Sequence, residues 1–518
     1  MLSTVYSAGL HGIDSFIVSV EVDGISGGDN NVFELVGLPD AAVKEAKERI
    51  RSACYNGGFL FPSLDFTVNL APANRRKEGS AFDVPMTVGI LRCGKFLFDS
   101  VDLSRKCFTG ELSLSGKLRG VRGVLCMCAA VRDNGFEEFY VPAENAAEAA
   151  AVEGIRVYGV DNIKQLIDHL NGIAPIAPTK RDEFCVSGDE LYGLDFCDVY
   201  GQAAAKRAME IAAAGGHNIL LIGPPGTGKS MLAKRLPTIL PPLTFDESIV
   251  STKIHSVSGV LPEGCSLITS RPFRSPHHTM SAVSLVGGGV NPMPGEISLA
   301  HNGVLFLDEF PEFPKTVTDS LRQPLEDGRV TITRASGRVT YPCSFMLVAA
   351  MNPCRCGFFG HPTRKCTCSQ LDVKRYISKI SGPMLDRIDI QVELPSLPFE
   401  EISGKQGSGE SSAQIRKRVI RAREFMRARL AAAGIDTTRY FCNSQLDAAA
   451  TRKTCVATDE ALEMMKMAFE RLGLSGRGYD RILRLARTVA DLDGAEMIES
   501  GHIAEAISLR SLDRKYWS

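Results

Sequence analysis

NILLIGPPGTGKS, residues 218–230, joins an apolar strand to a glycine-rich turn and the first residues of a helix. Glycine-rich backbone can wrap a polyphosphate closely enough for its N–H groups to point inward, and the following helix N-terminus adds positive potential. In such a loop we expect Lys229 to contact the β- and γ-phosphates of ATP and the Ser230 hydroxyl to hold Mg²⁺. The expected phosphate-binding residues are Gly223, Pro224, Pro225, Gly226, Thr227, Gly228, Lys229 and Ser230.

A second strand pattern ends in two carboxylates, in GVLFLDE at residues 303–309. Asp308 suits the outer coordination sphere of Mg²⁺, and Glu309 suits the polarisation of the attacking water. An Asp-Glu pair at a strand end can also be merely solvated. Because this pair follows a phosphate-binding loop, the sequence favours the catalytic interpretation.

Two further residues extend the candidate catalytic set. The strand pattern FMLVAAMN ends in Asn352, whose amide can help to orient the attacking water; capping of the strand is the alternative role. Arg387, in SGPMLDRID, is placed to reach the γ-phosphate of a neighbouring subunit, where a planar guanidinium neutralises charge in the transition state. A buried ion pair with Asp386 or Asp389 is the alternative for Arg387.

The bulk composition limits the classes of function. A chain of 518 residues is too long for one hydrophobic core and predicts about three domains. The net charge of −1 excludes a general basic surface for nucleic acid, so any polyanion site must be a local patch. The N-terminus has no basic region, Asp14 interrupts its apolar stretch, and no run approaches the roughly 18–20 apolar residues that span a bilayer. We expect a soluble, cytoplasmic protein without a membrane partner.

Two changes in composition predict the domain organisation, GIAPIAPTKRDE at residues 172–183 and SGKQGSGESS at residues 403–412. They divide the chain into an N-terminal domain (1–175), a linker (176–195), a central domain (196–402) and a C-terminal domain (413–518). Mixed patterns predict an α+β fold for the first, with strands at 16–22, 31–36 and 65–70 and helices at 40–54 and 145–152. Alternating strands (218–222, 304–307 and 345–350) and helices predict an α/β central domain with a parallel sheet.

The C-terminal domain is expected to be helical almost throughout, with helices at 412–433, 458–472, 478–492 and 498–509. Its segment SGRGYDRILRLART offers Arg477 as an arginine that contacts the phosphates of the nucleotide. Arg481 and Arg484 are rivals for this role, because they lie on the same predicted helix.

Four of the 15 cysteines cluster as two CxC pairs, Cys354 with Cys356 and Cys366 with Cys368. Four thiolates at this separation can bind a tetrahedral Zn²⁺. Reduced free thiols and disulfides are the alternatives, with disulfides disfavoured in a reducing cytoplasm. The pairs directly follow Asn352, so we expect a zinc ion here to stiffen a loop rather than to catalyse. His361, within the loop, is a lesser candidate ligand.

Residues 328–341 alternate like two strands about a short turn at 335–337, which predicts a hairpin carrying Arg329, Arg334 and Arg338. These arginines can grip DNA phosphates without reading the base sequence. A hairpin packed between subunits with solvated arginines is the alternative. A second basic segment, the predicted helix at 414–430, could follow a phosphate backbone or form a solvated face or subunit contact. Its cations are Arg416, Lys417, Arg418, Arg421, Arg423, Arg427 and Arg429.

The order of these motifs, with RPFRSPHHT, LRQPLEDG and SGRGYDRILRLARTVADL among them, resembles the ComM/YifB group of magnesium-chelatase-like AAA+ proteins. FELVGLPDAAVKEAKERIRSA and TVNLAPANRRKEGSAFDVP resemble the N-terminal domain of that group, so the resemblance covers nearly the whole chain. It implies a bacterial hexameric ATPase that migrates DNA branches in recombination and natural transformation. It also implies a Lon-protease-like N-terminal domain, a pore-lining hairpin and a C-terminal helical lid.

The implied Lon-like domain departs from the protease pattern. Ser80 in KEGSAFDVP stands where the Lon serine would fall, but no lysine occurs between Gly123 and Val131, where its partner is expected. A serine without a general base is a weak nucleophile, so we interpret this domain as a non-catalytic platform.

Three classes of function remain after these observations. We rank a DNA-translocating motor, a hexameric branch-migration helicase binding single-stranded and branched DNA, first. A protein-remodelling or magnesium-chelatase-type motor comes second, and an ATP-dependent peptidase third because of the missing lysine.

Overall fold

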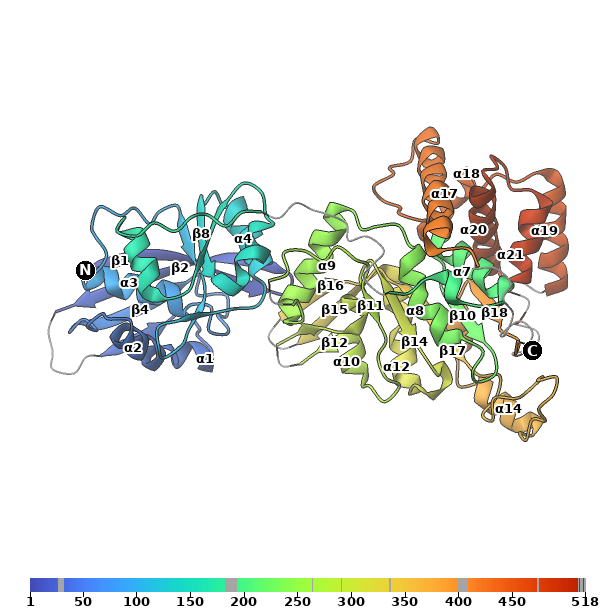
Figure 1. Cartoon of the computed structure of the whole chain (residues 1–518), viewed down its shortest axis with the longest axis horizontal. Coiled ribbons are helices and arrows are strands. Elements are labelled where there is room, and N and C mark those ends of the chain that lie inside the picture. The colour runs from blue at the N-terminus through green and yellow to red at the C-terminus, as the bar shows by residue number, and fades with distance from the viewer. Residues whose placement is uncertain are drawn as a thin grey trace.

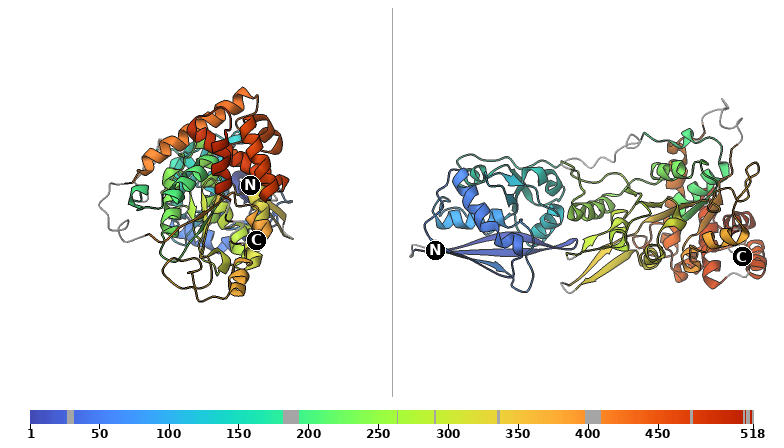
Figure 2. Two further views of the ribbon diagram at one scale, coloured as in Figure 1. Left: turned by 90° about the vertical axis from the view of Figure 1, so that its right-hand side faces the viewer. Right: turned by 90° about the horizontal axis from the view of Figure 1, so that it is seen from below.

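The computed structural model of the chain describes residues 1–26, 32–181, 193–262, 264–289, 291–334, 337–397, 409–472, 475–510, 512 and 516. Parts of both predicted connections, 182–183 and 403–408, lie outside these residues, as do 335–336 of the predicted hairpin turn. A seven-stranded sheet, a five-stranded sheet and a group of C-terminal helices follow one another along an elongated molecule (Figures 1 and 2).

The N-terminal sheet has the order β3-β4-β2-β1-β5-β8-β9. Its strands are β1 (Leu2–His11), β2 (Asp14–Ile25), β3 (Phe33–Val36), β4 (Asp65–Ala71), β5 (Lys106–Phe108), β8 (Glu138–Pro142) and β9 (Arg156–Val160), beside a small β6 (Glu111–Leu112) and β7 (Leu118–Arg119) pair. The helices are α1 (Ala41–Lys44), α2 (Ala46–Asn56), α3 (Asp83–Cys93), α4 (Val124–Asp133), α5 (Ala146–Ala150) and α6 (Ile163–Leu170).

This sheet combines two patterns of pairing. β1 pairs antiparallel with β2, and β2 with β4, whereas β5, β8 and β9 pair parallel and alternate with α4 and α5. The sequence analysis identified none of these three parallel strands, because strands of three to five residues are too short to show a period.

The central sheet is parallel in every strand pair, as the alternation of strands and helices predicts, and has the order β11-β14-β17-β10-β18. Its strands are β10 (Ile219–Ile222), β11 (Phe273–Arg274), β14 (Val304–Leu307), β17 (Met346–Met351) and β18 (Ile390–Glu393). The helices around it are α7 (Ala203–Gly215), α8 (Lys229–Ile239), α9 (Phe245–Ser258), α10 (Ala282–Val286), α11 (Glu296–Leu299), α12 (Lys315–Ser320), α13 (Arg322–Asp327), α14 (Gln370–Ile377) and α15 (Gly382–Leu385).

Two short antiparallel pairs accompany the central sheet, β12 (Gly287–Gly288) with β13 (Met293–Pro294), and β15 (Arg329–Arg334) with β16 (Gly337–Pro342). The second pair confirms the hairpin that the sequence predicts. In its register Thr333 lies opposite Arg338, and Arg334 opposite Gly337, so both arginines stand at the turn end.

The C-terminal region contains α17 (Ser412–Ala432), α18 (Ala448–Thr454), α19 (Asp459–Leu472), α20 (Gly476–Asp493) and α21 (Ser500–Ser508). β10 shows how these helices meet the sheet, because successive side chains of a strand point to opposite faces. Ile219 and Leu221 belong to the core that contains the C-terminal helices. Leu220 and Ile222 belong to the core beneath the β15–β16 hairpin. One strand therefore anchors both layers.

The N-terminal region contacts the central region through α4 and α9. The buried carboxylate of Glu148 accepts hydrogen bonds from the Ser256 hydroxyl and from the Leu125 N–H. Burial raises the pKa of Glu148, and these donors oppose that rise. Among the described residues, no helix has both the length and the apolarity needed to cross a membrane.

Candidate nucleotide-binding site

The predicted phosphate-binding loop, residues 223–230, connects β10 to α8 at the carboxyl edge of the central sheet. Gly226 and Gly228 have φ angles of 81° and 88°, in the left-handed region that favours glycine. An added Cβ at Gly223 would lie 2.5 Å from the carbonyl oxygen of Leu394. Backbone conformation therefore requires glycine at two positions of the loop, and close approach of the β18 end requires it at the third.

Lys229, the first residue of α8, is buried and points back into the loop. Its Nζ donates to the carbonyl oxygens of Gly223 and Pro224, at 2.7 and 2.8 Å, and to Oδ1 of Asn352 at 3.2 Å. Burial lowers the pKa of Lys229 to about 8, although Asp308 opposes this. The structure thus brings Lys229, Asn352 and Asp308 together as the sequence predicts.

Ser230 and Asp308 also meet, because the Ser230 hydroxyl donates to Oδ2 of Asp308 at 2.7 Å. Hydroxyl, carboxylate and phosphate oxygens are the ligands that coordinate Mg²⁺ at nucleotide-binding sites. The residues present therefore fit a magnesium ion bound together with a nucleotide.

Glu309 follows Asp308 with a φ of 51°, which is uncommon for a residue other than glycine. Its half-exposed carboxylate lies 3.3 Å from Nδ1 of His278. The imidazole ring of His278 packs against that of His277, with 4.2 Å between the ring centroids. Both histidines lie in the RPFRSPHHT motif, whose sequence predicts no role for either. β11 brings them to the site because it pairs with β14, which ends just before Asp308.

Arg387 is engaged within its own chain. Its Nε donates to the carbonyl oxygen of Arg322 at 2.8 Å and its Nη1 to that of Pro383 at 2.7 Å. Its Nη2 lies 2.9 Å from the carboxylate of Glu326 on α13, and the Arg387 side chain is 13% exposed. Glu326 is thus the acidic partner, whereas the alternative in the sequence analysis named Asp386 or Asp389.

The three candidate arginines of α20, Arg477, Arg481 and Arg484, differ in their contacts. Arg484 donates to the carbonyl oxygens of Ser444 and Leu446. Nε of Arg481 lies 3.9 Å from Asp389, and Arg477 is exposed at the start of the helix. Arg477 is therefore the least engaged of the three within this chain.

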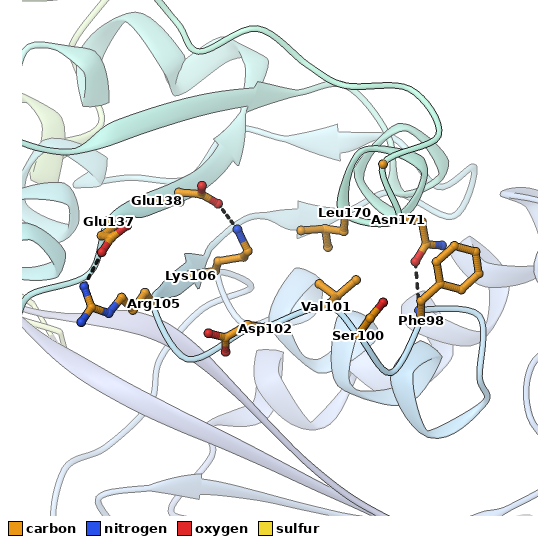
Figure 3. A pocket seen from close by; sticks show the side chains of 11 residues that line it. Phe98, Ser100, Val101, Asp102, Arg105, Lys106, Glu137, Glu138, Leu170 and Asn171 are labelled. Atoms are coloured by element: carbon orange, nitrogen blue, oxygen red, sulfur yellow. Dashed lines mark hydrogen bonds and ion pairs between the residues drawn. The ribbon is translucent and has the colours of Figure 1, made fainter.

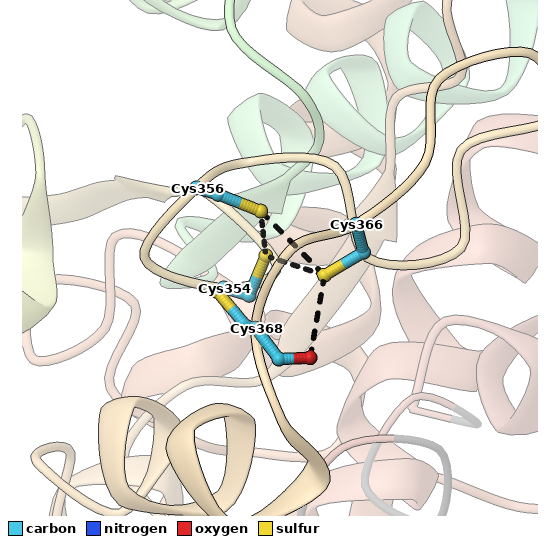
Figure 4. Close-up of side chains that lie close together, drawn as sticks. All are labelled: Cys354, Cys356, Cys366 and Cys368. Atoms are coloured by element: carbon cyan, nitrogen blue, oxygen red, sulfur yellow. Dashed lines mark hydrogen bonds between the residues drawn. The ribbon is translucent and has the colours of Figure 1, made fainter.

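The four cysteines form a compact cluster, with all four Sγ atoms within 4.8 Å of one another (Figure 4). Cys354 lies 3.4 Å from Cys356 and 3.7 Å from Cys366, and Cys356 lies 3.5 Å from Cys366. These separations far exceed the roughly 2.05 Å of a disulfide bond. They approach the roughly 3.8 Å between sulfur atoms that each lie about 2.3 Å from a tetrahedral zinc ion.

Backbone donors surround the cluster. Partial burial raises the pKa of Cys356, but the N–H groups of Phe358 and Thr367 and the neighbouring thiols lower it to about 5. The pKa values of the other three thiols are raised, so the fit to Zn²⁺ rests on the four clustered sulfur atoms, which bind this metal as thiolates. His361 lies outside the cluster, and its Nε2 contacts the Ser396 hydroxyl at 2.9 Å.

The hairpin presents its arginines to solvent. Arg329, Arg334 and Arg338 are exposed, whereas Val339 and Tyr341 on β16 are buried. The turn between β1 and β2 packs on this buried face, because a Cβ added to Gly12 would lie 2.4 Å from Val339.

Many of the cationic side chains of helix α17 bind groups of their own chain. Lys417, Arg421 and Arg427 are exposed, and the others bind groups of neighbouring helices or, for Arg418, also of the segment just before α17. These contacts join Arg416 to the Thr238 carbonyl, Arg418 to Glu210 and Glu410, Arg423 to the Ala213 and Ala214 carbonyls, and Arg429 to Asp491. These contacts disfavour a continuous DNA-binding face and also a fully solvated one, because four of the seven cations bind groups of their own chain, a role that the sequence did not predict.

Ser80 lines a cavity of about 580 Å³ between the N-terminal region and the β15–β16 hairpin, and its hydroxyl donates to Glu111. A second pocket of about 460 Å³ lies in the N-terminal region beside Val101 (Figure 3). Ion pairs of Arg105 with Glu137 and of Lys106 with Glu138 neutralise charge along its wall.

Family models match most of the chain. They are magnesium chelatase, subunit ChlI, over residues 195–402; subunit ChlI of Mg-chelatase over 20–145; and magnesium chelatase, subunit ChlI C-terminal, over 409–510. The chain is 41% identical over 517 residues to competence protein ComM of Haemophilus influenzae, covering 99% of this chain and 98% of that protein. It is 40% identical over 514 residues to the uncharacterized protein YifB of Salmonella typhimurium, covering 99% and 98%. The chain belongs to the ComM/YifB family of magnesium-chelatase-like AAA+ proteins.

Membership of the ComM/YifB family confirms the resemblance that the sequence motifs carry. It implies an AAA+ ATPase and is consistent with the use of ATP and Mg²⁺.

Proposed function

We propose that this protein is an ATP-driven hexameric motor that migrates DNA branches during recombination and natural transformation. The exposed arginines of the β15–β16 hairpin carry the proposal, because they offer phosphate-binding groups on a chain whose net charge is only −1. The 41% identity to a protein named competence protein ComM supports the same function. A motor that acts on DNA of this kind would work in the cytoplasm.

In this proposal the loop at 223–230 holds the polyphosphate, Lys229 binds the β- and γ-phosphates, and Ser230 with Asp308 holds Mg²⁺. The bound ion neutralises charge on the phosphates. Glu309 accepts a proton from the attacking water, and Asn352 orients that water. The contacts from Ser230 to Asp308 and from Lys229 to Asn352 support this assignment.

We assign Arg387 and Arg477 to contacts with nucleotide in the assembled ring. Arg387 acts as a finger on the γ-phosphate bound by a neighbouring subunit, and Arg477 senses phosphates from the helical lid, since Arg481 and Arg484 have other contacts. We retain the proposed division into a Lon-like N-terminal domain (1–175), a linker (176–195), an AAA+ core (196–402) and a lid (413–518).

We also propose that Cys354, Cys356, Cys366 and Cys368 bind one structural Zn²⁺ per chain. Sulfur separations of 3.4–3.7 Å among Cys354, Cys356 and Cys366 support this, with all four Sγ atoms within 4.8 Å of one another, because they are close to those of a tetrahedral site. Elemental analysis of protein purified without chelator tests this assignment.

A protein-remodelling or magnesium-chelatase-type motor is the second candidate, and the match of residues 195–402 to magnesium chelatase, subunit ChlI, favours it. A motor of this kind would be stimulated by a protein partner and would be indifferent to DNA.

A movable four-way DNA junction incubated with ATP and the protein tests the first candidate. Product strands should appear with the parent chain and should be absent with Glu309→Gln, which should bind ATP but hydrolyse it at least about 100-fold more slowly. Glu312→Gln, in the same segment and paired with Lys379, is the matched control and should behave like the parent. An assembled, ATP-hydrolysing protein that neither binds nor moves the junction would leave the protein-remodelling function in its place.

A further inference from the structure

The segment from Met351 to Gly357 forms one wall of the phosphate-binding loop. The Gly223 N–H donates to the carbonyl oxygen of Met351 at 3.2 Å. The Lys229 Nζ donates to Asn352 at 3.2 Å. Gly357 lies against the ring of Pro225, since a Cβ added to it would be 2.6 Å from Pro225 Cδ. Through Met351, Gly357 and Asn352, this short segment thus contacts the start, the middle and the end of the phosphate-binding loop.

The cysteine cluster closes this wall. Cys354 is fully buried two residues after Asn352, and the Gly357 N–H donates to its carbonyl oxygen at 3.0 Å. The second pair, Cys366 and Cys368, returns the chain to α14. There the buried Tyr376 faces the backbone N–H of Asn352, which partly offsets the rise in the Tyr376 pKa that burial causes. Both ends of the cysteine loop therefore meet beside the residue that contacts Lys229.

We propose that the metal-bound cysteine cluster holds the 351–357 wall in the conformation that binds nucleotide, so that zinc occupancy sets nucleotide affinity. This inference rests on the zinc assignment above. Four metal–sulfur bonds would fix the positions of Gly357 and Asn352 before ATP arrives. Without the ion, the binding reaction must order this segment itself, and that ordering lowers affinity.

Two glycines of the cysteine loop allow a matched test. Gly357 and Gly360 have φ angles of 85° and 75°, so alanine meets similar backbone strain at either position. Alanine at Gly357 also collides with Pro225, whereas a Cβ at Gly360 meets nothing within 4 Å. Gly357→Ala should weaken binding of a fluorescent ADP by about tenfold or more, and Gly360→Ala by less than about twofold. Equal affinities for the two variants would overturn the contact on which the inference depends.

The parent chain provides the decisive measurement, because coupling between two binding sites is reciprocal. ADP affinity is measured for the zinc-loaded chain and for the chain depleted by a chelator, with circular dichroism to establish that both are folded. Zinc affinity is measured with and without ADP. We expect depletion to weaken ADP binding by about tenfold, and saturating ADP to tighten zinc binding by the same factor.

The possible failures are distinct. Absence of zinc from the purified chain would remove the zinc assignment and this inference with it, while leaving the ATPase proposal intact. Zinc bound with the same affinity in the presence and absence of ADP would overturn the coupling alone. A zinc-loaded, folded chain that binds no nucleotide would instead contradict the proposed motor.

Discussion

Lys229 has three hydrogen-bond acceptors around its ammonium group, two of them carbonyl oxygens of residues 223 and 224 in its own loop. None of these groups has the charge of a phosphate, and burial lowers the pKa of Lys229 to about 8. Bound phosphates would favour the charged ammonium and raise that pKa again. Protonation of one side chain is therefore linked to nucleotide binding.

This linkage predicts a pH dependence with a definite sign. Below the free-chain pKa of about 8, Lys229 is charged with or without nucleotide, so affinity should not vary with pH. Above it, binding must take up a proton, and affinity should fall by up to about tenfold per pH unit. Titration calorimetry with a non-hydrolysable ATP analogue, from neutral to alkaline pH, measures this. Lys229→Arg should abolish the slope, because a guanidinium stays charged. A flat profile for the parent would refute the assigned contact.

At the scale of elements, long periodic segments were predictable from sequence and their partners were not. The predicted helix at 478–492 is observed as α20 (Gly476–Asp493), and the predicted helix at 40–54 is interrupted into α1 and α2. The basic helix α17 could not be interpreted, because its arginines bind carboxylates and carbonyl groups distant in sequence, such as Glu210 and Asp491. His278 was missed for a related reason, since only strand pairing in the sheet brings it to Glu309.

The β15–β16 hairpin yields a prediction for DNA binding. Changing Arg334 and Arg338 to Ala removes two exposed cations from its turn end and should weaken binding to any sequence alike. The slope of log affinity against log salt should become shallower by at least about one unit. Lys417→Ala combined with Arg421→Ala, which removes two exposed cations from α17, is the matched control. Equal losses of affinity in the two double variants would assign the effect to general charge rather than to the hairpin.

At the scale of the whole molecule, Arg387 yields a prediction that needs more than one chain. Arg387→Ala and Lys229→Ala should each abolish ATP turnover in uniform rings. Mixing the two should restore part of it, because some interfaces would pair an intact phosphate-binding loop with an intact arginine. ATPase assays on rings shown by native mass spectrometry to be mixed provide the measurement, and no recovery would contradict action between subunits.

The contacts that join the regions of the molecule had no local signature in the sequence. Ser256 and Glu148 meet across more than one hundred residues, and so do Gly12 and Val339. None of these residues belongs to a motif or periodic pattern that indicates its partner. Motif order could identify the family, and it predicts the phosphate-binding residues because that chemistry is local. Packing between regions depends on the complete fold.

The partners of Arg387 have a consequence for ring formation. Each of its three guanidinium nitrogens already has an acceptor in the single chain, from Arg322, Pro383 and Glu326. On the ring proposal, closing an interface exchanges these acceptors for phosphate oxygens, so bonds are swapped rather than gained. An exchange of this kind contributes little net enthalpy and is readily reversed. Interfaces of this kind would close and open readily, and in the separate chain every guanidinium nitrogen of Arg387 keeps a hydrogen-bond partner.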